Sequence, residues 1–299
     1  MSPQVSKLIL MVGLFVIAAI LVMTRRAWAG AISHGLPSTW RIAKMTVAEA
    51  RRRRVLQAVV VLVVLILSSL TFFTYLSPAE QSRMIIDSGL TTIAGFGMLL
   101  AIFVAAFMIP HEIETRTIYP ILAKPVRRFE FVLGKYVGAL IILGVVVAIM
   151  TVVLVGVLIL QDSLVQDLPD SKFDPNLFGV VFAAIMSYFS LAVLTALILL
   201  ISSVASTTMT VIGAVLLWGV GSMQTMLLDL STKVTGATKL LTLAFFYVVP
   251  PLQNFDFRMD VSNYQPLSLG AAIFALERGV LYAIVALVVA AIFFDNRQV

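Results

Sequence analysis

A short charged segment, residues 110–135, carries the side chains best suited to chemistry. His111 and Glu112 begin like a helical zinc site of the His-Glu-x-x-His type, but position 115 is threonine instead of the second histidine. Gly134 and Lys135 are followed by tyrosine and lack the upstream glycine and the Ser or Thr of a phosphate-binding loop. We therefore expect no catalytic residue, no metal site and no nucleotide site, and the chain is not expected to be an enzyme.

The elements around this segment must lie in a membrane. The chain has 299 residues, of which 61% are hydrophobic and 12% charged. Soluble domains average about 45–50% apolar and about 25% charged residues. The apolar runs do not alternate as barrel strands do, so the composition predicts an all-α polytopic membrane protein. Cysteine is absent, which excludes disulfides and thiolate metal sites.

Apolar runs of membrane length predict seven spans, at residues 8–23, 55–76, 90–109, 136–160, 177–204, 208–228 and 269–294. A further apolar run of ten residues, 240–249, stops at Pro250 and is too short to cross. We expect it to form a re-entrant or interfacial helix before the last span. Residues 1–36 are assigned to an N-terminal helix with its linker, and residues 37–299 to the main transmembrane domain.

The first apolar run has two interpretations. Ala27-Trp28-Ala29 resembles the cleavage site of a signal peptide. Arg25 and Arg26, however, lie between the run and that site, where they would hold this end in the cytoplasm. We favour a retained span with the N-terminus outside, and a cleaved signal is the alternative.

Residues 37–54 predict an amphipathic helix on the cytoplasmic surface of the membrane. Pro37-Ser38-Thr39 is a favourable helix start. The face expected to be apolar holds Trp40, Ala43, Val47 and Ala50. Arg51, Arg52, Arg53 and Arg54 directly precede a predicted span, where basic residues anchor topology and contact lipid head groups. We therefore assign the net charge of +6 to the membrane and not to nucleic acid.

The distribution of charge fixes the predicted orientation. The segments placed inside, 24–54, 110–135, 201–207 and 295–299, contain 14 of the 21 basic residues but only 5 of the 15 acidic ones. This asymmetry is what the positive-inside rule requires. It predicts a multi-pass protein of the inner (cytoplasmic) membrane, with residues 110–135 and the C-terminus in the cytoplasm.

An ion-coupled carrier is not expected from this sequence. Such carriers place ionisable groups inside the membrane, where they mark the path of the ion. The second to sixth predicted spans hold no ionisable residue except tyrosine, and only Glu277 and Arg278 remain as candidates. These two are adjacent, so they point about 100° apart on a helix. Transport would therefore need another source of energy.

The cytoplasmic segment resembles the coupling loop of ABC type-2 (exporter-type) permeases. The resemblance rests on Glu112-Ile-Glu114-x-x-Thr117, Leu122-Ala-Lys124-Pro125, Arg128-x-Glu-Phe and Leu133-Gly134-Lys135. Weaker similarity at Ile42-Ala-Lys44 and at Asn254-Phe-Asp256 extends it over about residues 40–299. The family usually has six spans, so residues 8–23 would be an additional one. Pro120 also departs from the pattern, because it would break a continuous coupling helix.

The resemblance implies a permease that dimerises with a second copy or a paralogue and binds ABC ATPase subunits. It implies no cofactor on this chain, since ATP and magnesium would bind to the ATPase. The residues expected to dock the ATPase are Glu112, Glu114, Thr117, Lys124, Pro125 and Arg128. Lys135 is expected to anchor the loop at the head groups, and Gly134 and Gly138 to let another helix approach closely.

Two functions remain open at this point. The leading one is the permease subunit of an ATP-driven ABC transporter, in the direction of export. The alternative is a polytopic membrane enzyme or assembly factor without transport activity. The sequence does not identify a substrate.

Overall fold

The computed structural model describes residues 31–52, 54–73, 81–108, 128–165, 176–223 and 250–296. All regular structure in this part of the chain is helical, which confirms the predicted fold class. The predicted elements at residues 8–23 and 240–249 lie outside it, as do residues 110–127 of the predicted coupling loop at residues 110–135. The helices are α3 (Ala31–Arg52), α4 (Arg54–Phe73), α5 (Gln81–Ala106), α8 (Arg128–Val165), α9 (Leu177–Val204), α10 (Thr207–Ser222), η3 (Leu252–Phe255), α13 (Arg258–Ser262) and α14 (Leu269–Asn296).

Four of the described helices are long and apolar enough to cross a membrane. They contain the segments Ser82–Ala106, Phe129–Gln161, Leu177–Val204 and Leu269–Phe294. The segments Ser38–Arg52 and Leu56–Leu70 meet at an angle of 68° and pass the same test only together, so the described spans number five if this bent pair is one span and four if it is a re-entrant loop. The predicted span at residues 208–228 corresponds to α10, which has 16 residues and is shorter than a full crossing.

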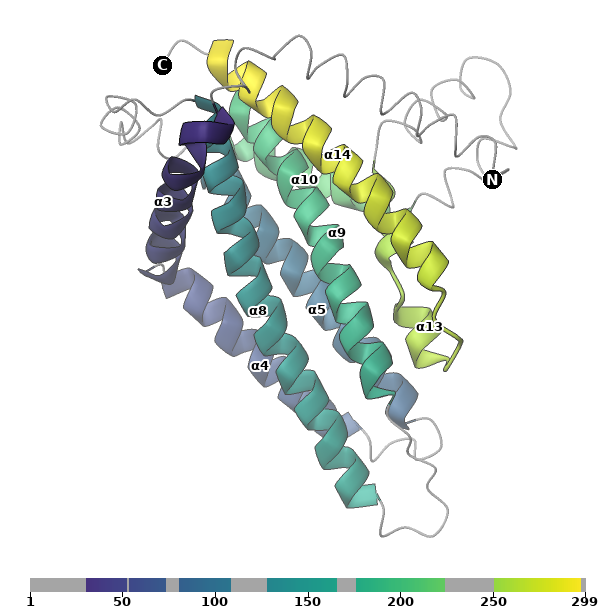
Figure 1. Ribbon diagram of the computed structural model, residues 1–299. Coiled ribbons are helices and arrows are strands. Elements are labelled where there is room, and N and C mark those ends of the chain that lie inside the picture. The colour runs from purple at the N-terminus through teal and green to yellow at the C-terminus, as the bar shows by residue number, and fades with distance from the viewer. Residues whose placement is uncertain are drawn as a thin grey trace.

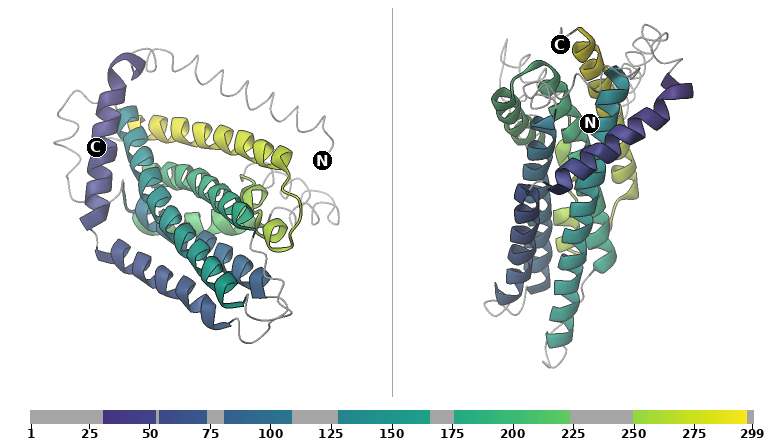
Figure 2. Two further views of the ribbon diagram at one scale, coloured as in Figure 1. Left: turned by 60° about the horizontal axis from the view of Figure 1, so that its bottom comes forward. Right: turned by 90° about the vertical axis from the view of Figure 1, so that its left-hand side faces the viewer.

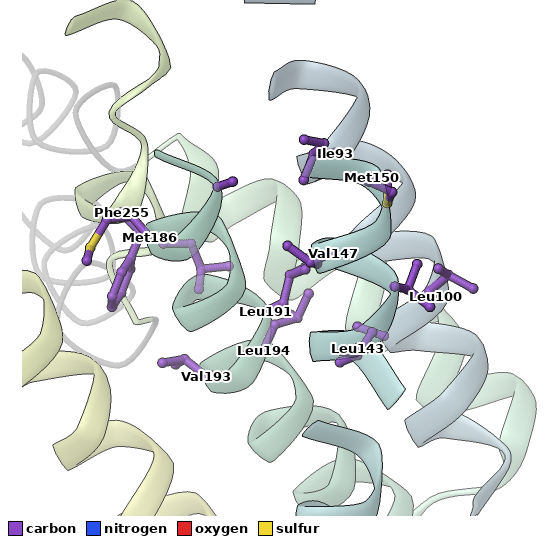
Figure 3. Packing of buried hydrophobic residues seen from close by; sticks show 14 of the residues in the cluster. Ile93, Leu100, Leu143, Val147, Met150, Met186, Leu191, Val193, Leu194 and Phe255 are labelled. Atoms are coloured by element: carbon purple, nitrogen blue, oxygen red, sulfur yellow. The ribbon is translucent and has the colours of Figure 1, made fainter. Parts of the chain in front are cut away.

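Helix α9 lies at the centre of the bundle, with α5 and α8 on one side and α14 on the other (Figure 1). It carries no charged residue, and most of its length is buried. Figure 3 shows the packing: Leu191 and Leu194 point toward α5 and α8, while Met186 and Val193 lie on the side of Phe255. A helix that is apolar on all sides is expected to be enclosed by others.

Helix α8 is longer than the predicted span. It begins at Arg128 instead of residue 136 and has 38 residues, which corresponds to about 57 Å. The hydrocarbon core of a membrane is about 30 Å thick, so α8 extends beyond it. The views in Figure 2 show α3 crossing α8 at one end of the molecule. The polar start of α8 was interpreted as loop because hydropathy marks where a helix enters lipid, not where it begins.

Hydroxyl groups inside the spans bond to their own helices. Thr195 Oγ1 donates to Leu191 O at 2.7 Å, and Thr210 Oγ1 donates to Ser206 O at 2.9 Å. This satisfies both hydroxyls without a ligand. These two hydroxyls therefore give no indication of a substrate path.

Two tyrosines join α8 and α9 reciprocally. Tyr136 of α8 donates its hydroxyl to Ala192 O of α9 at 3.3 Å. Tyr188 of α9 donates to Leu140 O of α8 at 3.2 Å. On each helix the accepting carbonyl lies one turn after the donating tyrosine, so the two bonds fix the register of the pair.

We expect the double substitution Tyr136→Phe with Tyr188→Phe to destabilise the bundle by about 1–2 kcal/mol. Both rings remain, so only the hydrogen bonds are lost, and each contributes about 0.5–1 kcal/mol in this setting. Unfolding of the purified protein in mixed detergent micelles measures the difference. A double variant as stable as the parent would show that the bonds do not hold α8 to α9.

Candidate functional site

The predicted docking residues lie at the edge of the described structure. Arg128 is the first residue of α8. The other members of the set fall in residues 109–127, outside the described part, as does Pro120: Glu112, Glu114, Thr117, Lys124 and Pro125. The structure therefore describes the helices on which this segment borders. These are the end of α5, the start of α8 and, packed against α8, the helix α3.

Helix α3 runs along the first turns of α8 in a fixed register. Three contacts join residues that are 92 apart in sequence: Ser38 with Glu130, Ile42 with Gly134, and Thr46 with Gly138. In each helix the contacting residues are four apart, so they lie in one row along one face. Rows with this spacing interdigitate when two helices pack closely.

The two glycines set how closely α3 approaches. A Cβ atom on Gly134 would lie 2.7 Å from Ile42 Cβ and 2.9 Å from the backbone oxygen of Thr39. A Cβ atom on Gly138 would lie 2.7 Å from Thr46 Cβ. These are closer than carbon and oxygen atoms pack, so neither position accepts a side chain unless α3 moves. The helix opposite Gly134 and Gly138 in this chain is α3.

A partly buried hydrogen bond also joins the two helices at this junction. Ser38 Oγ donates to Glu130 Oε2 at 2.6 Å. Glu130 is only 5% exposed and belongs to the first turn of α8. A carboxylate is favourable at the positive end of a helix dipole, but removing it from water is costly unless a donor satisfies it. The hydroxyl of Ser38 meets that requirement and ties α3 to the start of α8.

Lys135 is buried inside the protein near the start of α8. It is 3% exposed, and its Nζ lies 5.7 Å from the centroid of the Phe131 ring. Phe131 in turn stacks on Phe294 of α14, with ring centroids 5.5 Å apart. The start of α8 is therefore packed against α3 on one side and against the end of α14 on another.

The exposed face of α3 carries its basic residues. Arg51 and Arg52 are exposed in the last turn, where positive charge suits the negative end of the dipole. The side chains of Arg53 and Arg54 lie outside the described residues. Trp40 is 50% exposed and has Lys44 Nζ 5.5 Å from its ring.

The predicted apolar face of α3 is only partly buried inside the protein. Ala43 and Ala50 are buried, whereas Trp40 is exposed at the surface. The buried side instead holds Ile42, Ala43, Thr46 and Ala50.

A second polar cluster lies at the opposite end of the bundle. Arg258 Nε donates to Asp256 Oδ1 at 2.6 Å, and Arg258 Nη1 donates to Thr91 Oγ1 of α5 at 2.8 Å. The hydrogen bond to Asp256 raises the pKa of Arg258 above its ordinary value. The cluster ties the segment before α14 to α5 at Thr91, and it contains Asp256, one of the residues on which the family resemblance rests.

Three residues at the junction of α3 with α8 were not predicted as contact partners: Ser38, Glu130 and Thr46. The sequence does contain a signal for this contact, which is the spacing of the residues. Successive members are four residues apart in both sets, Ser38-Ile42-Thr46 and Glu130-Gly134-Gly138. Reading one row against the other requires knowing that α3 and α8 touch, which no local pattern shows. Glu130 was counted only as a loop charge because the predicted span began after it.

Comparison with protein families identifies most of the chain. A family model described as "ABC-2 family transporter protein" matches residues 63–299. The match begins within α4 and includes every later helix, so α3 precedes it. No curated protein matches the chain.

Proposed function

The chain belongs to the ABC-2 transporter family and is a membrane-spanning permease component. We propose that a separate ATPase drives this permease and that the direction of transport is export. The match of the family model to residues 63–299 confirms the family that the sequence resembles. The coupling to an ATPase, the docking residues and the direction of transport are our proposals.

The junction of α3 and α8 is the observation that supports coupling. The segment proposed to dock the ATPase leads into α8 at Arg128, the first residue of a continuous helix of 38 residues. Two residues later, Glu130 begins the row of contacts that fixes α3. A displacement of Arg128 would therefore move α3 and the membrane part of α8 together. The contacts of Ile42 with Gly134 and of Thr46 with Gly138 are so close that the two helices could not slide past each other.

ATP and magnesium would bind to the ATPase subunit and not to this chain. The sequence has no phosphate-binding loop, which supports this assignment. ATP binding would close two ATPase subunits, push on both docking segments and open a path between this permease and a second copy or a paralogue. The division into an N-terminal helix at residues 1–36 and a permease domain at residues 37–299 is part of this proposal.

Co-purification tests the proposed partner directly. The tagged chain, extracted from its native membrane in mild detergent, is expected to retain an ATPase subunit with a Walker motif in equimolar amount. The purified complex should hydrolyse ATP, while the chain expressed alone should not. If the chain never retains an ATPase under conditions that preserve its helical fold, the coupling proposal is wrong.

Cysteine labelling tests the proposed orientation, because the chain contains no cysteine of its own. We expect Arg52→Cys, exposed at the end of α3, to react with a membrane-impermeant maleimide only in inverted vesicles. Gln265→Cys, exposed just after α13 at the other end of the bundle, should react only in intact cells. The reverse pattern would invert the topology and place the docking segment outside.

A further inference from the structure

A cavity of about 430 Å³ lies in the angle between α3 and α4 and is closed at the back by α5. One turn of α3 forms its polar end with Thr46, Glu49 and Ala50. Its other walls are apolar side chains of α4 and α5, among them Val59, Val104 and Phe107. Small-molecule sites commonly have this character, with a mostly apolar lining and a few polar groups at one end.

Thr46 leaves a hydroxyl without a protein partner at this end. The residue is 2% exposed, and among the described residues its Oγ1 has no hydrogen bond. Its Cβ and Cγ2 are the atoms that face Gly138. Thr195 and Thr210 bond to their own helices, and Thr46 does not. A buried hydroxyl without a partner is destabilising, so a ligand that supplies one would be favoured.

Charges of both signs follow Thr46 along α3. Glu49 lines the cavity and follows Thr46 by three residues, which places both on one side of α3. A carboxylate has acceptor positions for several donors at once. Arg52 is exposed one turn further along the same side of the helix. The order along α3 is therefore a hydroxyl, a carboxylate and a guanidinium group.

We propose that this cavity binds one phospholipid whose head group carries a primary ammonium. An acyl chain fills the space between α4 and α5, the ammonium donates to Glu49 and Thr46, and the phosphate lies beside Arg52. An anionic lipid without an amine has no ammonium group to donate to Glu49 and Thr46. A hydrophobic cation without a phosphate would leave Arg52 unmatched.

The bound lipid would also support the junction of α3 with α8. Thr46 belongs to both, because its methyl side contacts Gly138 while the residue lines the cavity. An occupied cavity fills the space behind α3 and holds this helix against α8.

Native mass spectrometry of the full-length chain, with any subunits that co-purify, tests the site. After extensive delipidation we expect about one phosphatidylethanolamine per chain to remain. In competition, phosphatidylethanolamine should exceed phosphatidylglycerol and phosphatidylcholine about tenfold, the effect of one charge-assisted hydrogen bond. Phosphatidylcholine is the informative probe, since its head group is cationic but has no N–H donor.

Two variants separate the parts of the proposal. Val104→Trp fills the cavity and should lose the retained lipid, whereas Val152→Trp, on the exposed face of α8, should keep it. Glu49→Gln should retain a lipid but lose the tenfold preference for phosphatidylethanolamine. If Val104→Trp does not fold, this loss of preference is the result that tests the site. The site is absent if the wild type retains no lipid or folded Val104→Trp retains as much. The head-group assignment is wrong if the preference survives Glu49→Gln, or if another amphiphile is retained instead.

Discussion

Replacing Gly134 by alanine is expected to separate α3 from α8 and to reduce ATP-driven transport at least tenfold. The new methyl group would lie 2.7 Å from Ile42 Cβ and 2.9 Å from the Thr39 backbone oxygen. Neither atom is the end of a flexible side chain, so the helix itself must shift. Overpacking of this kind typically costs about 1–3 kcal/mol.

Hydrogen exchange measured by mass spectrometry locates the change. Amides of residues 38–52 should exchange faster in Gly134→Ala, and those of α9 should not. Gly156→Ala is the matched control, because it lies on the same helix and nothing lies within 4 Å of its added Cβ. Ser38→Ala should give a milder form of the same effect, since it removes the donor to Glu130 without displacing α3.

The reduction in transport follows from the way the junction would transmit force. With α3 in place, a push on Arg128 moves two helices as one body. With α3 detached, the same push bends only the start of α8 and is lost before it reaches the membrane. If Gly134→Ala loosens α3 but transport continues at the wild-type rate, α3 is a structural helix and not part of the coupling.

The spans were readable from sequence where a helix stays inside the membrane. Residues 177–204 were predicted as one helix, and α9 has these same bounds. Asn176 caps its start and Ala205 caps its end. Asn176 Oδ1 accepts a hydrogen bond from Gly179 N at 3.0 Å, which marks the start. Here the change from apolar to polar residues and the end of the helix coincide.

Where a helix continues out of the membrane, the same method fails. Helix α5 begins at Gln81, nine residues before the predicted span, and its first turns contain Arg83 and Asp87. These turns are stabilised by contacts with distant residues, such as Ser82 Oγ with the Tyr264 hydroxyl at 2.8 Å. Contacts of this kind leave no periodic signal in the sequence.

The candidate site was predictable only in part, because it too depends on contacts between residues that are distant in sequence. Gly134 and Gly138 were recognised as a place for close helix approach, but their partner α3 was expected to lie on the membrane surface without a specified contact. The burial of Lys135 was not foreseen, because a lysine beside a predicted span is normally an anchor. Helix α8 begins earlier than predicted, so Lys135 lies within a packed helix and its Nζ is near the Phe131 ring of the preceding turn.

The second large effect is expected from Glu114→Arg in the docking segment. Glu112 and Glu114 follow Pro110, a residue suited to the first position of a helix, where carboxylates are stabilised by the dipole. If they bind a basic surface of the ATPase, reversal of one charge replaces an attraction by a repulsion. Loss of one partner of a close interfacial charge pair costs about 2–5 kcal/mol, so binding should weaken at least about thirtyfold.

Co-purification and single-turnover transport measure this loss, and the stability of the chain should not change. Asp260→Arg on α13 is the matched control, because it makes the same charge reversal at the opposite end of the bundle. An arginine on the ATPase changed to glutamate should restore binding to Glu114→Arg if the two side chains meet. Binding that persists in Glu114→Arg would move the docking face to residues 124–128, whose charges are basic, and would require an acidic surface on the ATPase.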